Sequence, residues 1–333
     1  MTRRFASTVT GGPAVAVSCL SKRFRTSWGR RVEALREVSF SVGVGEIYGL
    51  LGPNGAGKST TLKILLGFMK PSAGEGTLLG ERLGTVSVRR RVGFLPENPY
   101  FYDYLTAPEF LDTCASLAGL PRGGRSALIS RTLERVGLEP GQKLRLRKFS
   151  KGMLQRVGLA QAIIHDPELL ILDEPMSGLD PIGRRQVRDL ILELRREGKT
   201  VVFSSHVLPD VEALCERVAM LVGGELRQEG RVADLLRHDQ GGFEIEVRDL
   251  PPSLAQAWAA QSCLRECGDR LIVSAPDQSA LEERVQQIFR AGATLLGVKP
   301  IARSLEDVFL AEVGGQPGLP SASITPGHRE EAA

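Results

Sequence analysis

A glycine-rich segment that ends in lysine and serine is the feature that most constrains this chain. Residues 52–60 fit the pattern G-x-x-x-x-G-K-[S/T], with Gly52, Gly57, Lys58 and Ser59 at the fixed positions. A short apolar run, residues 46–51, precedes the segment, and residues 60–66 after it have helical spacing. A turn between a strand and a helix lets backbone N–H groups surround phosphate oxygens at the positive end of the helix dipole. The segment therefore predicts a site for a nucleoside triphosphate.

In such a loop the lysine reaches the β- and γ-phosphates, and the hydroxyl that follows it binds Mg²⁺. We therefore assign Lys58 to the phosphates and Ser59 to the metal. The expected nucleotide-binding residues of the loop are Gly52, Pro53, Asn54, Gly55, Ala56, Gly57, Lys58, Ser59 and Thr60.

A second apolar run, residues 169–172, ends in two acidic residues, Asp173 and Glu174. A buried parallel strand delivers its last residues to the sheet edge where the phosphate loop also lies. We expect Asp173 to hold Mg²⁺ directly or through water, and Glu174 to orient or deprotonate the attacking water. His206 follows the next strand, residues 200–204, and is a candidate for contact with the γ-phosphate and that water.

Several polar residues are expected to begin helices. Ser150 is well placed as the N-cap of the helix that follows it, and the N–H groups there, with Ser150 and Gly152, can bind phosphate from outside the first pocket. Thr106 and Ser126 are expected to cap two earlier helices.

The amino-acid composition indicates an ordinary globular protein. The chain has 333 residues, of which 42% are hydrophobic and 25% charged, as in ordinary globular proteins. No apolar run approaches the roughly 18–20 residues that cross a bilayer, and the N-terminus lacks the apolar stretch of a secretory signal. The net charge is +4, with basic clusters within residues 22–31 and 143–151. These clusters are read as a solvated surface or as a contact for anionic lipid headgroups; without interleaved aromatic residues, no nucleic-acid partner is expected.

The order of the segments predicts the fold class. Continuous apolar strands that alternate with helices indicate an α/β protein with a mixed, mostly parallel sheet and helices on both faces. We expect a flexible tail over residues 1–12 and an ATPase domain over 13–237, with a helical subdomain at about 98–163. A small accessory α/β domain is expected over 243–313, followed by a disordered Gly/Pro/Ser-rich tail over 314–333.

Taken in order, these segments resemble the nucleotide-binding subunit of ATP-binding-cassette (ABC) transporters, over about residues 13–237. The resemblance implies an ABC-type P-loop core that binds ATP with Mg²⁺ and hydrolyses it. It implies a head-to-tail dimer, in which ATP on one subunit is sandwiched by the signature residues of the other, Ser150, Lys151 and Gly152. By the same resemblance Asp180 belongs to the D-loop and His206 is the switch histidine.

Two departures from the family pattern indicate which branch of the family the chain resembles. The signature reads Phe-Ser-Lys-Gly-Met from Phe149 in place of Leu-Ser-Gly-Gly-Gln, and Glu97 stands at the Q-loop position, where the family has glutamine. Together with the run at residues 304–310, both departures resemble the ATPase subunits of type-2 ABC exporters. That branch implies a polytopic membrane permease as partner, and a second copy of this chain or a homologous ATPase subunit. The chain would then be cytoplasmic and peripheral on the cytoplasmic face of the cell membrane.

The permease is expected to dock around Glu97 and residues 98–125. Four aromatic residues there are suited to holding a short helix of the partner: Tyr100, Phe101, Tyr102 and Tyr104. Packing of these rings in the core is the alternative. For the ring that stacks on adenine, the resemblance points first to Phe24 and then to Trp28.

The main functional alternative is a soluble ABC ATPase with a regulatory, ribosome-linked or DNA-linked role. Such proteins usually carry two cassettes or zinc-bearing insertions, whereas this chain has one cassette and no Cys-x-x-Cys pair. The cargo, the choice between a homodimer and a heterodimer, the role of the C-terminal module and contact of Glu97 with Mg²⁺ stay open at the level of sequence.

Overall fold

The computed structural model describes residues 12–25, 31–139, 143–237, 242–261, 263–300 and 304–314. Its centre is a six-stranded sheet in the order β10-β9-β3-β8-β7-β6. Five of these strands are parallel, and β10 is antiparallel to β9. The strands are β3 (Ile47–Leu51), β6 (Val92–Leu95), β7 (Leu169–Asp173), β8 (Thr200–Ser205), β9 (Arg217–Val222) and β10 (Glu225–Arg231). The predicted α/β class is confirmed.

The central strands are apolar throughout because both faces of the sheet are buried. Along β7, Leu170 and Leu172 pack into one hydrophobic cluster with the helices, whereas Leu169 and Ile171 pack into a second cluster on the opposite face. This alternation fixes the register of the strand, since a slip of one residue would move every side chain to the opposite face of the sheet.

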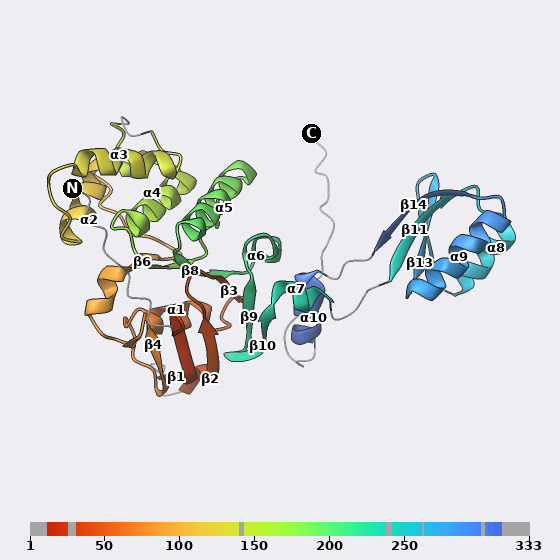
Figure 1. Ribbon diagram of the computed structural model, residues 1–333, viewed down its shortest axis with the longest axis horizontal. Helices are drawn as coiled ribbons and strands as arrows, with labels where there is room; N and C mark the ends of the chain where they lie inside the picture. The colour runs from red at the N-terminus through yellow and green to blue at the C-terminus, as the bar shows by residue number, and fades with distance from the viewer. Residues whose placement is uncertain are drawn as a thin grey trace, which may run out of the picture.

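The second face is covered by helix α1 (Lys58–Leu65) together with an antiparallel sheet. This sheet has the order β2-β1-β4-β5, and Ala34 and Leu35 of its strand β2 lie against Gly57 of the phosphate loop. Figure 1 shows β1, β2 and β4 on the side of the central strands opposite to α2–α5. The strands are β1 (Val15–Arg25), β2 (Arg31–Val42), β4 (Ala73–Leu78) and β5 (Glu81–Arg82).

The first face carries most of the helices. They are α2 (Ala107–Leu117), α3 (Arg125–Arg135), α4 (Lys151–Ile163), α5 (Pro181–Arg196), α6 (Leu208–Leu214) and α7 (Val232–Arg237), with a 3₁₀ turn at Leu146–Lys148. Another 3₁₀ turn, Ser87–Arg91, buries Val88 in the cluster of the opposite face. Two predicted caps are confirmed. Thr106 forms a capping box with Glu109 at the start of α2, and the hydroxyl of Ser150 accepts a hydrogen bond from Met153 N at the start of α4.

The prediction that Ser126 caps a helix is wrong, because the N-cap of α3 is Gly124, two residues earlier. Arg125 explains the shift. Its side chain is buried, pairs with Asp112 at 3.3 Å and donates to the carbonyl of Leu120. This tertiary anchoring fixes Arg125 inside the first turn and leaves Ser126 within the helix.

The C-terminal strands form a separate four-stranded antiparallel sheet in the order β12-β13-β11-β14. With its two helices the chain order is β-α-β-β-α-β, which is the split βαβ arrangement of ferredoxin-like modules. Its elements are β11 (Phe243–Arg248), α8 (Pro252–Ala260), β12 (Leu264–Cys267), β13 (Arg270–Ala275), α9 (Gln278–Arg290) and β14 (Thr294–Pro300). A hydrophobic cluster of its own, which includes Val273, Trp258 and Ile288, holds the helices against the sheet.

The last helix, α10 (Leu305–Gly314), does not join this module. Leu305 and Val308 are buried in the same cluster as Val211 and Leu235 of α6 and α7. Figure 1 shows α10 beside α7, which places the end of the described chain against the central sheet's helical layer. Nowhere in the ranges that the structure describes is there a helix with the length and apolarity needed to span a bilayer.

The packing of α10 leads to a stability prediction. Leu305→Ala removes a fully buried side chain and is expected to cost about 2–5 kcal/mol. Leu310→Ala is the matched control, since the Leu310 side chain on the same helix is 59% exposed. Calorimetry should show a lower Tm for Leu305→Ala and almost no change for the control. Equal Tm values for the two variants would mean that α10 does not stabilise the cluster.

Candidate active site

The glycine-rich segment forms a pocket of about 300 Å³ between β3 and α1. Residues 53–60 all line it, together with Glu97, Glu174 and His206 from elsewhere in the chain. Ala34 of β2 also lines the pocket and was not expected from sequence. The structure therefore brings the phosphate loop, the acidic pair and the strand-following histidine to one place.

Two glycines of the loop are required by close backbone approach. At Gly57 the φ angle is +104°, and an added Cβ would lie 2.5 Å from Leu35 Cδ2 and 2.8 Å from the Ala34 carbonyl oxygen. At Gly52, where φ is +155°, a Cβ would lie 2.3 Å from the carbonyl oxygen of Leu221. Any side chain at either position would force neighbouring strands apart, so the loop reaches its shape only with glycine.

Lys58 is buried at the base of the pocket. Its Nζ donates hydrogen bonds to the carbonyl oxygens of Gly52 at 2.6 Å and Pro53 at 3.3 Å, and lies 3.8 Å from Glu174 Oε1. Burial lowers the pKa of Lys58. The carboxylates of Glu174, Asp173 and Glu97 oppose this pKa shift by favouring the charged ammonium. The buried ammonium group of Lys58 is thus paired with carbonyl and carboxylate oxygens. An anionic ligand can take the place of these partners or bind beside them.

Asp173 is held by two hydroxyl groups. Ser59 Oγ donates to Asp173 Oδ1 at 3.2 Å, and Ser204 Oγ donates to the same oxygen at 2.5 Å. Ser59 and Asp173 therefore offer two neighbouring oxygen atoms, which are the ligands that Mg²⁺ prefers while it keeps several waters. The donor set fits this ion.

Glu174 lies at the end of β7 in a left-handed backbone conformation, with φ at +51°. A non-glycine residue in this region is strained by about 1–3 kcal/mol, and such strain is concentrated at functional sites. Its Oε2 lies 2.9 Å from His206 Nδ1, and its Oε1 faces Lys58. The carboxylate is buried and the histidine is half exposed, so His206 connects Glu174 to the open side of the pocket.

Two buried polar residues contact this centre and were not identified from sequence. Ser204 touches both Asp173 and the backbone of Glu174, and Gln155 of α4 donates to the carbonyl oxygens of Glu174 and Pro175. A serine at the end of an apolar strand was a visible signal for the first. A glutamine within a helix gave no comparable signal.

The other candidates lie outside the residues that line the pocket. Ser150 and Lys151 are exposed at the start of α4, and Gly152 follows them. The Lys151 side chain crosses Gly178, where an added Cβ would lie 2.7 Å from Lys151 Cδ. Asp180 caps α5 by accepting a hydrogen bond from Gly183 N at 2.7 Å.

Of the two candidates for stacking on adenine, the structure describes Phe24. Phe24 lies on β1 with its ring partly exposed, and Lys22 Nζ is 5.3 Å from the ring centroid. It is not among the residues that line the phosphate pocket. Trp28 lies outside the described residues.

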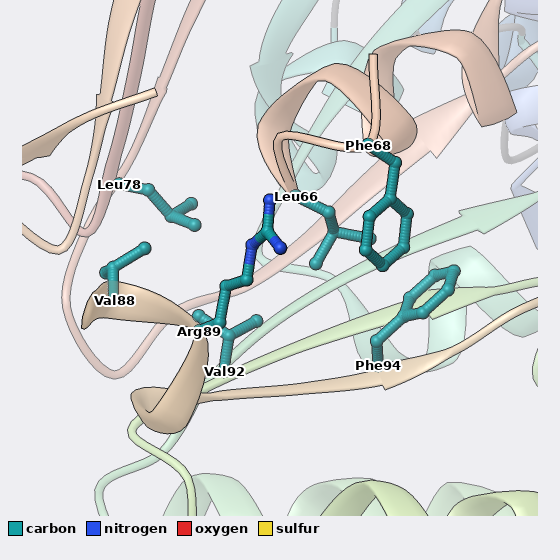
Figure 2. Close-up of a pocket in the computed structure, with 7 residues that line it drawn as sticks. All are labelled: Leu66, Phe68, Leu78, Val88, Arg89, Val92 and Phe94. Carbon is teal, nitrogen blue, oxygen red and sulfur yellow. The ribbon is translucent and has the colours of Figure 1, made fainter. Parts of the chain in front are cut away.

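A second, smaller cavity of about 100 Å³ has a different character. Figure 2 shows that its walls are apolar apart from Arg89, with Phe68 and Phe94 facing one another across one side. The two rings are 5.5 Å apart, and Arg89 donates to the carbonyl oxygen of Gly67 at 3.2 Å. This cavity offers no group for phosphate chemistry beyond one guanidinium.

Comparisons with known proteins agree with this geometry. Residues 35–177 match the family model described as ABC transporter. An uncharacterized ABC transporter ATP-binding protein of Synechocystis is 53% identical over 69% of this chain, a match that spans 66% of that relative and so just under two thirds of its length. A second uncharacterized ABC transporter ATP-binding protein, from Nostoc, is 42% identical over 94% of this chain and 93% of its own length.

The similar proteins include relatives with a named transport role and a structure solved in a named state. The Nod factor export ATP-binding protein I of Rhizobium etli is 35% identical, over 83% of this chain and 87% of its own. A dimeric ATP-binding cassette, solved in a post-hydrolysis state with ADP and Pi, is 26% identical with a TM-score of 0.60. That match covers 65% of this chain and 98% of the solved one.

The loop glycines lead to a prediction with an internal control. Gly57→Ala should lower nucleotide affinity by about tenfold or more, because its methyl group meets Leu35 and the Ala34 backbone. Gly55→Ala meets nothing within 4 Å and carries only the strain of its positive φ, +82°. Titration calorimetry with a nucleoside triphosphate compares the two. Equal losses of affinity would show that strain, and not the close approach, limits the loop.

Proposed function

This chain belongs to the ABC transporter family as an ATP-binding, ATP-hydrolysing subunit, and we propose that it drives a separate membrane permease of an export system. The observation that carries the proposal is the meeting of Lys58, Asp173, Glu174 and His206 at one phosphate pocket. The named export role of the Rhizobium relative supports the direction of transport.

In the proposed site, Lys58 binds the β- and γ-phosphates of ATP and the loop N–H groups surround them. Ser59 and Asp173 hold Mg²⁺, which when bound neutralises charge on the phosphate oxygens. The Glu174 carboxylate accepts a proton from the attacking water, and His206 holds that carboxylate in position through Nδ1. Glu97 lines the same pocket and adds negative charge near Lys58. Its carboxylate is therefore suited to orienting a water molecule or a cation in the pocket.

We infer that the complete site is shared between two cassettes. Ser150 and Lys151 are exposed at the start of α4, and Gly152 follows them half-buried, yet none of the three lines the phosphate pocket of the same chain. A second copy of this chain or a homologous subunit, packed head to tail, would present these residues to the γ-phosphate, with Asp180 nearby. The similar cassette that was solved as a dimer supports this arrangement.

Substitution of the two central residues tests hydrolysis and dimerisation together. Glu174→Gln should bind ATP normally but lose about 100-fold or more in turnover, because an amide cannot accept the proton. Since ATP then persists, this variant should accumulate as an ATP-bound dimer in gel filtration. Lys58→Ala should instead lose ATP affinity and remain without the ATP-induced dimer. Full turnover by Glu174→Gln would exclude its catalytic role.

We further infer that residues 13–237 form the ATPase domain, with a helical subdomain at about 98–163, and that 243–313 contain an accessory α/β module. The separate hydrophobic cluster of the C-terminal sheet supports this division. Burial of Leu305 and Val308 beside α6 and α7 supports counting α10 with the ATPase domain. We propose a cytoplasmic location, with the chain held on the membrane face by its permease, and no nucleic-acid partner.

Exposed aromatic rings support a docking surface for that permease next to the pocket. Phe101 is buried in the core, but Tyr100, Tyr102 and Tyr104 are 93%, 53% and 58% exposed. They lie on the segment that runs from Phe94, in the apolar cavity of Figure 2, past Glu97 in the phosphate pocket. A short helix of the permease could cover these rings. Glu97, on the same segment of chain, would then link that helix to the nucleotide pocket that it lines.

The docking proposal predicts a loss that leaves ATP binding intact. Tyr102→Ala with Tyr104→Ala removes two rings whose centroids lie 6.1 Å apart and should weaken permease binding by about tenfold or more. Phe289→Ala is the control, because this 64% exposed ring lies on α9 in the C-terminal module. The readout is the amount of tagged chain retained with its permease in detergent. Retention equal to that of the control would place the docking surface elsewhere.

A further inference from the structure

The backbone of Glu174 is unusual among the strained positions of this chain. Six non-glycine residues in the described ranges have positive φ angles, namely Cys19, Glu37, Leu79, Asp166, Glu174 and Asp249. Glu174 is the only buried member of this group. Exposed residues in this conformation can relax toward solvent, whereas a buried one persists only when its surroundings determine it.

Two buried side chains hold both polar groups of the Glu174 backbone. Its N–H donates to Ser204 Oγ at 3.0 Å, and its carbonyl oxygen accepts from Gln155 Nε2 at 3.3 Å. The carbonyl oxygen also accepts from the backbone N–H of Ser177 at 3.1 Å, so Gln155 supplies its side-chain partner. The same amide nitrogen of Gln155 lies 3.0 Å from the carbonyl oxygen of Pro175. Both side chains are almost fully buried, so water cannot replace these bonds.

The two residues come from different elements on either side of β7. Ser204 is the second-last residue of β8 and also donates to Asp173, so it links the two acidic residues of the site. Gln155 lies in α4, the helix that begins at Ser150. The position of Glu174 is therefore defined by the sheet from one side and by the signature helix from the other.

We propose that Gln155 and Ser204 are positioning residues, which fix the Glu174 backbone in its left-handed conformation so that the carboxylate faces Lys58 and His206. This proposal rests on the proposed catalytic role of Glu174. Without either bond the backbone relaxes, and the carboxylate leaves the line between the phosphate loop and the histidine. A displacement of about 1 Å at a reacting group can lower a rate by about 100-fold.

Gln155→Met and Ser204→Ala test the proposal in the full-length chain. Methionine keeps a side chain of similar length without the amide, and alanine removes only the hydroxyl. Each variant should lower kcat for ATP hydrolysis by about 10- to 100-fold while the Kd for ATP stays within about twofold. Gln161→Met, on the same helix but outside the hydrogen bonds that hold Glu174, is the control and should keep the wild-type kcat. Ser204→Thr retains the hydroxyl and should recover part of the kcat lost by Ser204→Ala.

A double substitution separates positioning from a purely structural role. In the Glu174→Gln background no carboxylate remains to be placed, so adding Gln155→Met should change the residual rate by less than about twofold. Single-turnover assays with radiolabelled ATP in enzyme excess measure this slow rate. If Gln155→Met lowers the rate by the same factor in both backgrounds, Gln155 acts independently of Glu174 and the proposal is wrong.

The remaining outcomes distinguish this proposal from the function on which it rests. A wild-type kcat in folded Gln155→Met and Ser204→Ala, with Glu174→Gln inactive, overturns the positioning roles alone. Full turnover in Glu174→Gln overturns the catalytic assignment instead. A fall in Tm together with equal losses in kcat and ATP affinity would show that the two residues support the fold and not the carboxylate.

Discussion

The burial of a single ammonium group, that of Lys58, is the constraint on which the rest of the structure depends. A buried cation must be paired and hydrogen-bonded, and here two loop carbonyls and the Glu174 carboxylate do this. To provide them, the loop closes so tightly that Gly52 and Gly57 admit no side chain. To bring Glu174 within reach, β7 must lie beside β8 in the interior of the sheet with both faces covered. The site and the fold are thus two consequences of the same electrostatic requirement.

A second constraint acts at the edge of the central sheet, where polar residues lie at the ends of buried apolar strands. β7 and β8 are buried along their whole length, and their last residues are Asp173 and Ser205. Because the strands are parallel, their ends meet, so Ser204 reaches Asp173 and the backbone of Glu174. The helices then add what the sheet cannot: Gln155 from α4 holds Glu174 from the opposite side. The strained backbone conformation of Glu174 persists because three elements, β7, β8 and α4, together hold it in place.

The C-terminal part shows how an added module is attached without disturbing this centre. Its sheet has a hydrophobic cluster of its own, and the chain then returns so that Leu305 and Val308 of α10 pack beside α6 and α7. Helix α6 begins two residues after His206, so the last helix rests on the element that follows the histidine of the site. The module is therefore connected at both ends to the layer that carries the active site, through α7 and through α10.

The sequence by itself determined the parts that depend on local pattern. The phosphate loop, the apolar strands that lead to Asp173 and His206, and the Ser150 and Thr106 caps follow from spacing, apolar pattern and hydrogen-bonding capacity within a few residues. Tertiary structure decided what depends on distant partners. Ser126 does not cap α3, because Arg125 is anchored to Asp112 and Leu120. Phe101 enters the core while its tyrosine neighbours stay exposed, and no local pattern separates these rings. Gln155 and Ser204 became visible as neighbours of Glu174 only in three dimensions, since 19 and 30 residues of chain separate them from it and only packing makes them meet.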